Sequence, residues 1–451
     1  MKVHFISIGG SAMHNLAIAL HLKGYQVTGS DDEIFDPAKS RLEKYDLLPK
    51  SIGWHPEKID QTLDAVILGM HARIDNPELL KAKELGIKIY SYPEYLYEQS
   101  KNKKRVVIGG SHGKTTITAM ILHVLNHLGI DTDYMVGAQL EGFDVMVKLS
   151  ENAPYIIIEG DEYLTSPIDL RPKFHVYKPN IALISGIAWD HINVFPTFEN
   201  YVEQFQIFAD LIERNGTLVY CEEDIEVAKV AKKIRKDIQG IAYKTPEYLI
   251  EDGKTCLLKS SKKIPLRIFG QHNLVNLEGA KNVCLQLGIS EDNFYDAIQS
   301  FGGASKRLEL IKQNADTSIY KDFAHSPSKL KATIHAVKEQ FPNRKLIACV
   351  ELHTFSSLTK EFLKQYKNTM EEADIAIVYF NPHTIEHKKL SPISEIDIKE
   401  TFGREDLFVF TDSKKIEIFL KNQEWKEKTL LMMSSGNFDG INFSSLSNAL
   451  I

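Results

Sequence analysis

A glycine-rich loop carrying one lysine and two threonines is the strongest chemical signal in the sequence. The apolar stretch 106–108 before it is typical of a strand, and the stretch 117–128 after it is typical of a helix. Backbone N–H groups of such a loop and the following helix N-terminus cradle polyphosphate. Lys114 is expected to reach the β- and γ-phosphates and the Thr115 hydroxyl to ligate Mg²⁺. The candidate phosphate-binding residues are Gly110, Ser111, His112, Gly113, Lys114, Thr115 and Thr116.

The spacing of this loop departs from the general G-x-x-x-x-G-K-[ST] pattern, because Gly110 stands only three residues before Gly113. A chance Gly-Lys-Thr in a loop is the alternative interpretation. The strand before the loop and the helix after it favour the phosphate site.

Two further polar groups follow apolar strands. Glu159, Asp161 and Glu162 come directly after the run 155–158, and Asp190 and His191 follow the apolar run 181–184. Open α/β sheets place ligand groups at the carboxyl ends of strands, and carboxylate oxygens suit Mg²⁺. The alternatives are a solvated acidic loop and a structural histidine.

A second glycine turn lies near the start of the chain. The strand expected at 3–8 leads into Gly9, Gly10 and Ser11, a helix is expected over 12–23, and a second strand ends at Ser30 and Asp31. The turn could bind a nucleotide phosphate, with Asp31 available to a ribose hydroxyl. An ordinary tight strand-to-helix connection is the alternative.

Composition and patterning bound the fold class. The chain has 451 residues, 43% hydrophobic and 25% charged, and a formal net charge of -6, which gives no reason to expect nucleic acid or an anionic membrane as partner. The sequence opens without a signal-peptide pattern and has no uninterrupted apolar run long enough to cross a bilayer, so we expect a cytoplasmic protein. Short β-branched runs alternate with amphipathic segments, which predicts an α/β fold with mostly parallel sheets.

Three domains are expected from the length and from two breaks in the pattern. The segment 99–105 is polar, basic and free of apolar residues, as in a linker, and a glycine pair at 302–303 follows a helical pattern. The expected domains are a Rossmann-like domain over 1–103, a central P-loop domain over 104–302 and a second Rossmann-like domain over 303–451. We expect hinge closure near 101–105 and 301–304.

These motifs occur in the order seen in the Mur ligases. GSHGKTT resembles their phosphate loop, EGDE their acidic strand end and WDH their Asp-His motif, while the segment 270–276 resembles their G-x-H-N-x-x-N pattern. The likeness covers essentially the whole chain, since 8–13 and 29–31 resemble the family's UDP-binding domain and 306–309 and 322–327 its C-terminal domain.

The resemblance implies an ATP-dependent ligase that joins a UDP-linked muramic acid to an amine through an acyl phosphate. It implies UDP-sugar binding by Gly9, Gly10, Ser11, Ser30 and Asp31, and Mg²⁺ binding by Thr115, Glu159 and His191. Further implied ATP contacts are His272, Asn273, Asn276 and Arg307. The implied catalytic residues are Lys114 and His191, with His325 and Asp322 as candidates for the base that deprotonates the amine.

Two branches of the family couple an amine to UDP-N-acetylmuramate itself, one adding L-alanine and one a murein tripeptide. Tyr163, the pattern at 169–179 and the segment 435–440 favour the tripeptide branch, and L-alanine ligase is the alternative. Ser326 stands where the family has a second histidine, and the segment 351–356 lacks the arginine of the alanine branch. No lysine occurs between His191 and Arg214, which agrees with both muramate-coupling branches. The sequence leaves the oligomeric state open.

Three other functions are alternatives. A nicotinamide dehydrogenase would explain the first turn, but that turn lacks G-x-G-x-x-G and leaves Lys114 and Thr115 unexplained. A mechanical or regulatory P-loop NTPase and a non-catalytic UDP-sugar-binding protein are the others. Substrate-independent ATP hydrolysis would favour the NTPase, and nucleotide binding without turnover would favour the binding protein.

Overall fold

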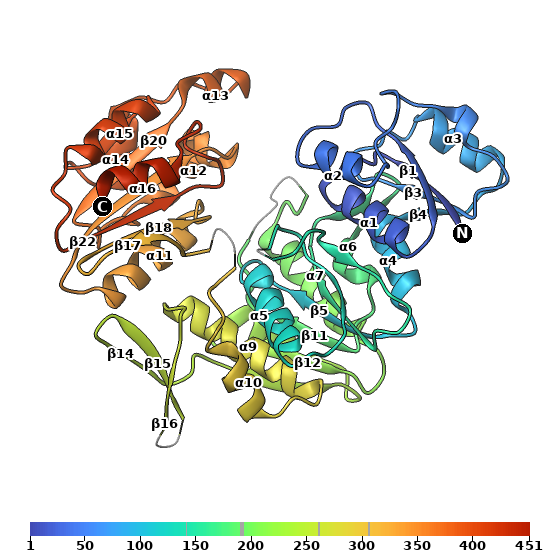
Figure 1. Ribbon diagram of the computed structural model, residues 1–451, viewed down its shortest axis with the longest axis horizontal. Coiled ribbons are helices and arrows are strands. Elements are labelled where there is room, and N and C mark those ends of the chain that lie inside the picture. The colour runs from blue at the N-terminus through green and yellow to red at the C-terminus, as the bar shows by residue number, and fades with distance from the viewer. Residues whose placement is uncertain (141, 190–193, 260–261, 305–306) are drawn as a thin grey trace. The chain divides into compact units, whose positions relative to one another are not determined.

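The computed structural model describes residues 1–140, 142–189, 194–259, 262–304 and 307–451 (Figure 1). The described chain forms two compact units. The first unit comprises residues 1–245 and 275–298, and the second comprises 246–274 and 299–451. No helix among the described residues has the length and apolarity needed to cross a membrane.

The first unit begins with a parallel sheet in the order β2-β1-β3-β4. Its strands are β1 (Lys2–Ile6), β2 (Gln26–Ser30), β3 (Ala65–Leu68) and β4 (Ile89–Ser91). Its helices are α1 (Ser11–Leu22), α2 (Ala38–Lys44), η1 (Pro56–Lys58), α3 (Pro77–Glu84) and α4 (Tyr92–Ser100). The Ser91 side chain and the Glu94 side chain cap each other's backbone N–H groups, which fixes the start of α4.

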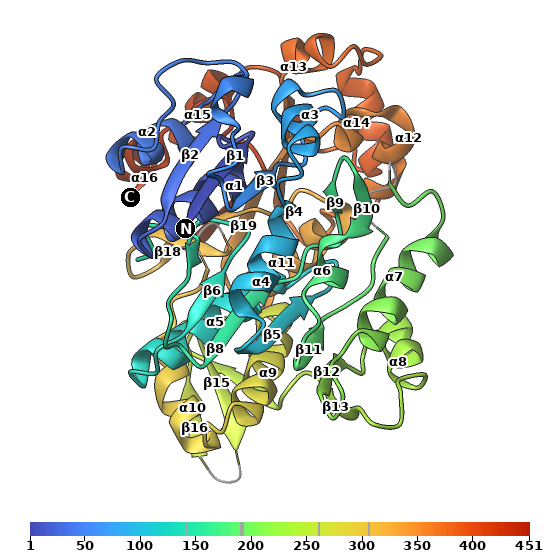
Figure 2. The same ribbon diagram turned by 90° about the vertical axis from the view of Figure 1, so that its right-hand side faces the viewer.

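The larger sheet of the first unit runs in the order β13-β12-β11-β5-β8-β6-β7, and Figure 2 shows the succession from β13 to β6. It is parallel except for β7, which pairs antiparallel with β6. The strands are β5 (Lys104–Gly109), β6 (Asp133–Met135), β7 (Val147–Lys148), β8 (Tyr155–Glu159), β11 (Ile181–Ile184), β12 (Thr217–Cys221) and β13 (Gln239–Tyr243). Because Ile108 pairs with Glu159 and Gly109 with Ile184, the phosphate loop and the acidic strand end lie at one edge.

The remaining elements of this unit surround the larger sheet. They are the hairpin β9 (Leu164–Ser166) and β10 (Asp169–Pro172) and the helices α5 (Lys114–His127), α6 (Lys173–Val176), α7 (Phe198–Asp210), α8 (Ile225–Ala231) and α10 (Glu291–Ile298). Helix α9 (Gln271–Gln286) crosses the division at 274–275 between the two units.

The second unit is built on a sheet in the order β17-β18-β22-β19-β20-β21, parallel except for β17. Its strands are β17 (Glu309–Gln313), β18 (Thr317–Asp322), β19 (Lys345–Leu352), β20 (Ile375–Phe380), β21 (Phe408–Phe410) and β22 (Lys428–Met433). Its helices are α11 (Pro327–Gln340), η2 (Ser356–Leu358), α12 (Lys360–Leu363), η3 (Lys364–Tyr366), α13 (Pro382–His387), α14 (Glu395–Phe402), α15 (Ser413–Lys421) and α16 (Phe443–Leu450). Alternate strand residues feed separate apolar clusters, as expected of a sheet covered on both faces.

A small antiparallel sheet in the second unit was not predicted from the sequence. It consists of β14 (Tyr248–Glu251), β15 (Lys254–Lys259) and β16 (Lys262–Pro265). The three strands are short and partly exposed, and β15 and β16 begin with lysines, so the sheet lacks the long apolar runs used to predict strands. The expected α/β class with mostly parallel sheets is confirmed.

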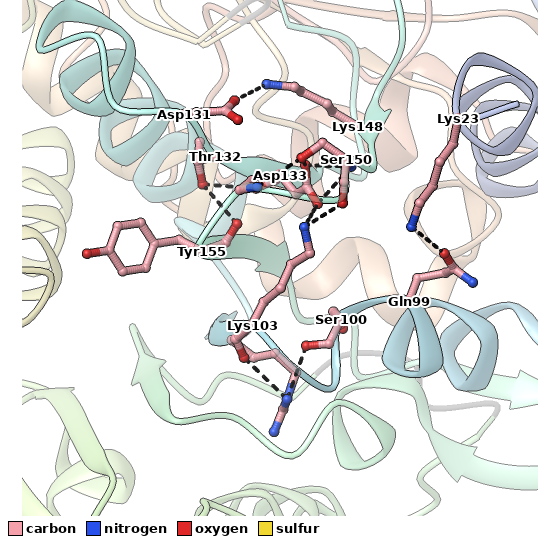
Figure 3. Close-up of polar contacts among 12 residues, drawn as sticks. Lys23, Gln99, Ser100, Lys103, Asp131, Thr132, Asp133, Lys148, Ser150 and Tyr155 are labelled. Carbon is pink, nitrogen blue, oxygen red and sulfur yellow. Dashed lines mark hydrogen bonds and ion pairs between the residues drawn. The ribbon is translucent and has the colours of Figure 1, made fainter.

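The polar segment 99–105, predicted as a linker, makes hydrogen bonds to other parts of the first unit (Figure 3). Lys103 Nζ lies 2.6 Å from Asp133 Oδ2 and 2.6 Å from the Ser150 carbonyl oxygen, and the Asp133 side chain is fully buried. The Arg105 guanidinium is also buried and donates to main-chain carbonyls, including that of Lys101 at 2.9 Å. A basic segment can therefore be internal when carbonyl and carboxylate oxygens satisfy its donors. Both residues belong to the first compact unit.

Candidate functional site

The predicted phosphate loop joins β5 to α5, and two of its glycines have backbone conformations that disfavour other residues. Gly110 has φ +132° and Gly113 has φ +79°. A Cβ atom at Gly113 would collide with Asn276 Oδ1, and one at Gly110 would collide with the Ser185 side chain. The loop is therefore closely packed on both sides, and α5 starts at Lys114 directly after the turn. Thr116 is buried in the first turn of α5.

Lys114 points back along this loop. Its Nζ donates to the Gly110 carbonyl oxygen at 2.5 Å and lies 2.7 Å from Glu162 Oε2. Burial opposes the charged form, but the carboxylates of Glu162 and Asp161 outweigh it and raise the pKa of Lys114 above its ordinary value. The ammonium group therefore stays charged where a terminal phosphate is expected.

Two hard oxygen ligands meet beside the loop, as the sequence predicts. Thr115 Oγ1 donates to Glu159 Oε1 at 2.8 Å, and the Gly137 N–H donates to Glu159 Oε2 at 2.9 Å. Burial raises the pKa of Glu159, because nothing fully offsets its desolvation. A hydroxyl and a carboxylate together in a buried position fit Mg²⁺, which prefers oxygen ligands.

The other two acids of the strand end pair within the site. Asp161 Oδ2 lies 2.5 Å from Lys173 Nζ. Burial by itself would raise the pKa of Asp161, but the charges of Lys173 and Lys114 outweigh burial, so the pKa lies below its ordinary value. Glu162 accepts a hydrogen bond from the Tyr201 hydroxyl at 3.1 Å, which lies 3.0 Å from Ser111 Oγ. Tyr201 was not predicted, because no spacing rule links residues this far apart in sequence.

The two histidines proposed near the phosphates differ in what the structure describes. The His112 carbonyl oxygen accepts a hydrogen bond from Ser185 Oγ, and the His112 ring lies against Gly186. His191 and Asp190 lie outside the described residues. The neighbouring Trp189 is 44% exposed and donates from Nε1 to the Phe195 carbonyl oxygen at 3.0 Å.

The residues of the G-x-H-N-x-x-N segment are divided between the units. Asn276 belongs to the first unit and reaches the phosphate loop at Gly113. His272 and Asn273 belong to the second unit, where Asn273 Nδ2 donates to the Phe269 carbonyl oxygen at 2.9 Å. The structure thus brings one of the three to the loop within a single unit.

The base candidates lie in the second unit at the end of β18. Both oxygens of Asp322 accept main-chain hydrogen bonds at 2.6 Å, from Leu308 N and Ala324 N, and burial raises its pKa. His325 Nδ1 lies 2.8 Å from the Phe323 carbonyl oxygen. A carbonyl can only accept, so neutral His325 carries its proton on Nδ1 and its lone pair on Nε2, which suits a base. The Arg307 guanidinium lies over the Phe323 ring, 4.9 Å from its centroid.

The N-terminal glycine turn contacts the acid that the sequence assigns to it. Gly9 N donates to Asp31 Oδ2 at 2.7 Å, and Asp32 N donates to Asp31 Oδ1 at 3.0 Å. Burial raises the pKa of Asp31 to about 6. The Ser30 carbonyl oxygen accepts from Ser7 N at 2.9 Å, which closes the turn before Gly10 and Ser11.

Three family models match the chain in order. The Mur ligase family catalytic domain matches residues 2–104, the Mur ligase middle domain matches 108–284 and the Mur ligase glutamate ligase domain matches 306–436. The UDP-N-acetylmuramate–L-alanine ligase of Clostridium kluyveri is 32% identical over 385 residues, 82% of each chain. That of Persephonella marina is 30% identical over 450 residues, 96% of this chain and 94% of the relative.

The chain belongs to the Mur ligase family. It is therefore an ATP-dependent ligase that forms a C–N bond, with three Mur ligase domains in an α/β fold. A solved UDP-N-acetylmuramate–alanine ligase from Thermotoga maritima shares the fold, with TM-score 0.72, 20% identity and coverage of 100% of this chain and 98% of that one. A murein peptide ligase from Psychrobacter arcticus does so with TM-score 0.63, 21% identity and the same coverage.

The prediction of the tripeptide branch is wrong. The curated relatives at about 30% identity over most of the chain are L-alanine ligases, which favours the alternative. Several of the residues used for the prediction make contacts within the chain. Lys173 pairs with Asp161, Arg171 pairs with Asp169, and Phe174 and Tyr177 are fully buried. After β22, Phe438 N donates to Glu351 Oε2 of β19 at 2.8 Å, so that segment is held against the neighbouring strand.

Proposed function

We propose that this chain is a UDP-N-acetylmuramate:L-alanine ligase that acts in peptidoglycan biosynthesis in the cytoplasm. The observation that carries the proposal is the cluster of Lys114, Thr115 and Glu159 in a chain whose curated relatives bear that name. UDP-N-acetylmuramate would bind at the turn formed by Gly9, Gly10 and Ser11, with contacts from Ser30 and Asp31. The domain limits proposed are 1–103, 104–302 and 303–451.

The chemistry needs an activated carboxylate, because a free carboxylate is a poor electrophile with no adequate leaving group. Transfer of the ATP γ-phosphoryl group would give an acyl phosphate, and the amine would then displace phosphate. Bound Mg²⁺ would neutralise charge on the phosphates, held by Thr115 and Glu159 and, as the family resemblance implies, His191. Lys114 would exchange Glu162 for the γ-phosphate, so the same ammonium group serves the free and the loaded states.

Other residues are proposed to bind ATP and to deprotonate the incoming amine. Asn276, His272, Asn273 and Arg307 are proposed to contact ATP, as the family resemblance implies. His325 is proposed as the base for the incoming ammonium in preference to Asp322, whose oxygens already bind two main-chain N–H groups.

The test is a coupled assay of phosphate release with ATP, Mg²⁺, UDP-N-acetylmuramate and L-alanine, with the product identified by mass. We expect phosphate release only when all four are present, and its loss in Lys114→Met. Lys101→Met is the matched control, because Lys101 pairs only on the surface with Glu98. Phosphate release that ignores L-alanine, or a Lys114→Met variant that keeps full activity, would overturn the proposal.

A further inference from the structure

The loop between β6 and β7 contacts the candidate metal site at one end. This β6–β7 loop comprises the described residues 136–140 and 142–146. Gly137 N donates to Glu159 Oε2 at 2.9 Å, while the other oxygen of Glu159 accepts from Thr115. A Cβ at Gly137 would lie 3.3 Å from Glu159 Oε1, so the main chain approaches the carboxylate closely. The loop therefore helps to set the position of Glu159.

The other end of the β6–β7 loop is held by a side chain from α1. Met146 N donates to Asn15 Oδ1 at 2.9 Å, and Val136 N donates to the Met146 carbonyl oxygen at 2.9 Å. The second of these bonds closes the base of the loop one residue before Gly137. Any shift of Met146 is thus passed to the N–H group that binds Glu159.

Asn15 is buried, and its amide is oriented by its partners. Asn15 Nδ2 donates to the Ser11 carbonyl oxygen at 2.8 Å and lies 3.0 Å from His14 Nε2. His14 Nδ1 lies 2.9 Å from the Gly10 carbonyl oxygen, which can only accept, so Nε2 of the neutral ring is the acceptor for Asn15. Both N–H donors and the oxygen acceptor of the Asn15 amide are therefore hydrogen-bonded. One donor binds Ser11 of the N-terminal glycine turn directly, and the other binds His14, which in turn binds Gly10.

A second contact joins the same surfaces. Arg41 of α2 donates to the Gln139 side chain in the β6–β7 loop, and its other terminal nitrogen lies 3.4 Å from His14 Nε2. Helix α1 also packs against β7. The first sheet and the metal-binding edge of the larger sheet are thus connected through the β6–β7 loop within one compact unit.

We propose that Asn15 is a positioning residue for phosphoryl transfer, which fixes the β6–β7 loop so that Gly137 holds Glu159 and which links that loop to the turn at Gly10 and Ser11. The inference rests on the proposed function for the roles of Glu159 and of the turn. Nucleotide binding at the turn then steadies the Asn15 amide, and through Met146 it steadies the metal-binding acid. The substrate carrying the carboxylate would in this way prepare the site that activates it.

The test compares Asn15→Ala with Asn282→Ala. Asn282 makes the same type of bond to the carbonyl four residues earlier, at 2.9 Å from Glu278 O, but has no contact with the loop. In Asn15→Ala we expect the Mg²⁺ concentration for half-maximal activity to rise about tenfold. This is the effect of losing one hydrogen bond to a charged group, here the bond from Gly137 N to Glu159. Asn15→Asp keeps an acceptor for Met146 but loses both amide donors and places a carboxylate against the Ser11 carbonyl oxygen, so it should also raise this Mg²⁺ concentration.

Hydrogen exchange gives a readout that does not depend on activity. The peptide containing Gly137 should exchange faster in Asn15→Ala, while peptides of α5 and β8 exchange as in the unsubstituted chain. UDP-N-acetylmuramate should slow exchange of that peptide in the unsubstituted chain but not in Asn15→Ala. Unchanged exchange and an unchanged Mg²⁺ requirement in Asn15→Ala would overturn the inference, as would equal changes in Asn282→Ala. If the protein shows no ligase activity, the proposed function is wrong, but hydrogen exchange measured without ligand still tests the contact between Asn15 and Met146.

Discussion

Replacing Gly113 with alanine tests whether the phosphate loop depends on its close approach to Asn276. Two costs follow from the structure. The φ of +79° at Gly113 is unfavourable for alanine by about 1–2 kcal/mol, and the new Cβ would collide with Asn276 Oδ1. Relief of the collision would displace the loop N–H groups from the phosphates. Loss of one hydrogen bond to a charged group, worth roughly 1.5–3 kcal/mol, corresponds to a 10- to 100-fold weaker ATP affinity.

Gly129→Ala is the matched control for this variant. Gly129 also has positive φ, +66°, and follows the same helix α5, but nothing lies within 4 Å of an added Cβ. Both variants should lose stability in urea unfolding, Gly113→Ala by more because of the collision with Asn276, whereas only Gly113→Ala should lose ATP affinity in calorimetric titration. Adding Asn276→Ala to Gly113→Ala should recover part of the lost stability, because it removes the atom in collision. ATP affinity in Gly113→Ala within twofold of that in Gly129→Ala would refute the reasoning.

Three other changes test separate features of the first unit. Thr115→Val removes the hydroxyl beside Glu159 and should lower kcat by about 10–100-fold while raising the Mg²⁺ requirement; a normal Mg²⁺ titration would contradict the proposed ligand role. Asp31→Asn removes a carboxylate whose native pKa of about 6 exceeds the ordinary 3.8, and it also loses one of the two main-chain hydrogen bonds that the carboxylate accepts, so the pH dependence of stability is the test rather than stability at one pH. The stability contributed by this raised pKa is fully present below pH 3.8 and is lost as pH rises through about 6, so the parent should lose stability relative to Asp31→Asn between pH 4 and pH 7, and a difference in urea midpoint that is constant with pH would contradict this origin. Arg105→Met should destabilise the chain by about 3–5 kcal/mol, since it leaves several buried carbonyl groups without their donor; a change under about 1 kcal/mol in urea unfolding would show that water replaces the guanidinium.

The sequence predicts the phosphate loop and the acidic strand end because both follow apolar strands. Once β5 and β8 pair in parallel, their carboxyl ends must meet, so the proximity of Thr115 and Glu159 follows from local pattern and sheet geometry. The N-terminal turn and Asp31 follow the same rule on β1 and β2.

The contacts that complete the site could not be predicted, because they join residues far apart in sequence without a repeating pattern. Tyr201 reaches Glu162 from α7, and Asn15 reaches Met146 from α1. The tripeptide prediction failed for a related reason. Residues such as Lys173 match a branch pattern locally, but Lys173 pairs with Asp161 of the same domain. Its presence therefore does not indicate which amine the enzyme accepts.

The ion pair between Lys103 and Asp133 limits where the chain can be cut into separately expressed fragments. A fragment that began at residue 104 would keep the Asp133 carboxylate, fully buried and hydrogen-bonded to Ser150, but would lack the ammonium group that neutralises it. Such a fragment would carry an uncompensated charge in its interior, and its yield and solubility should suffer accordingly. A cut placed before Ser100 would retain both Lys103 and the carbonyl groups that receive Arg105, and would give the better-behaved piece.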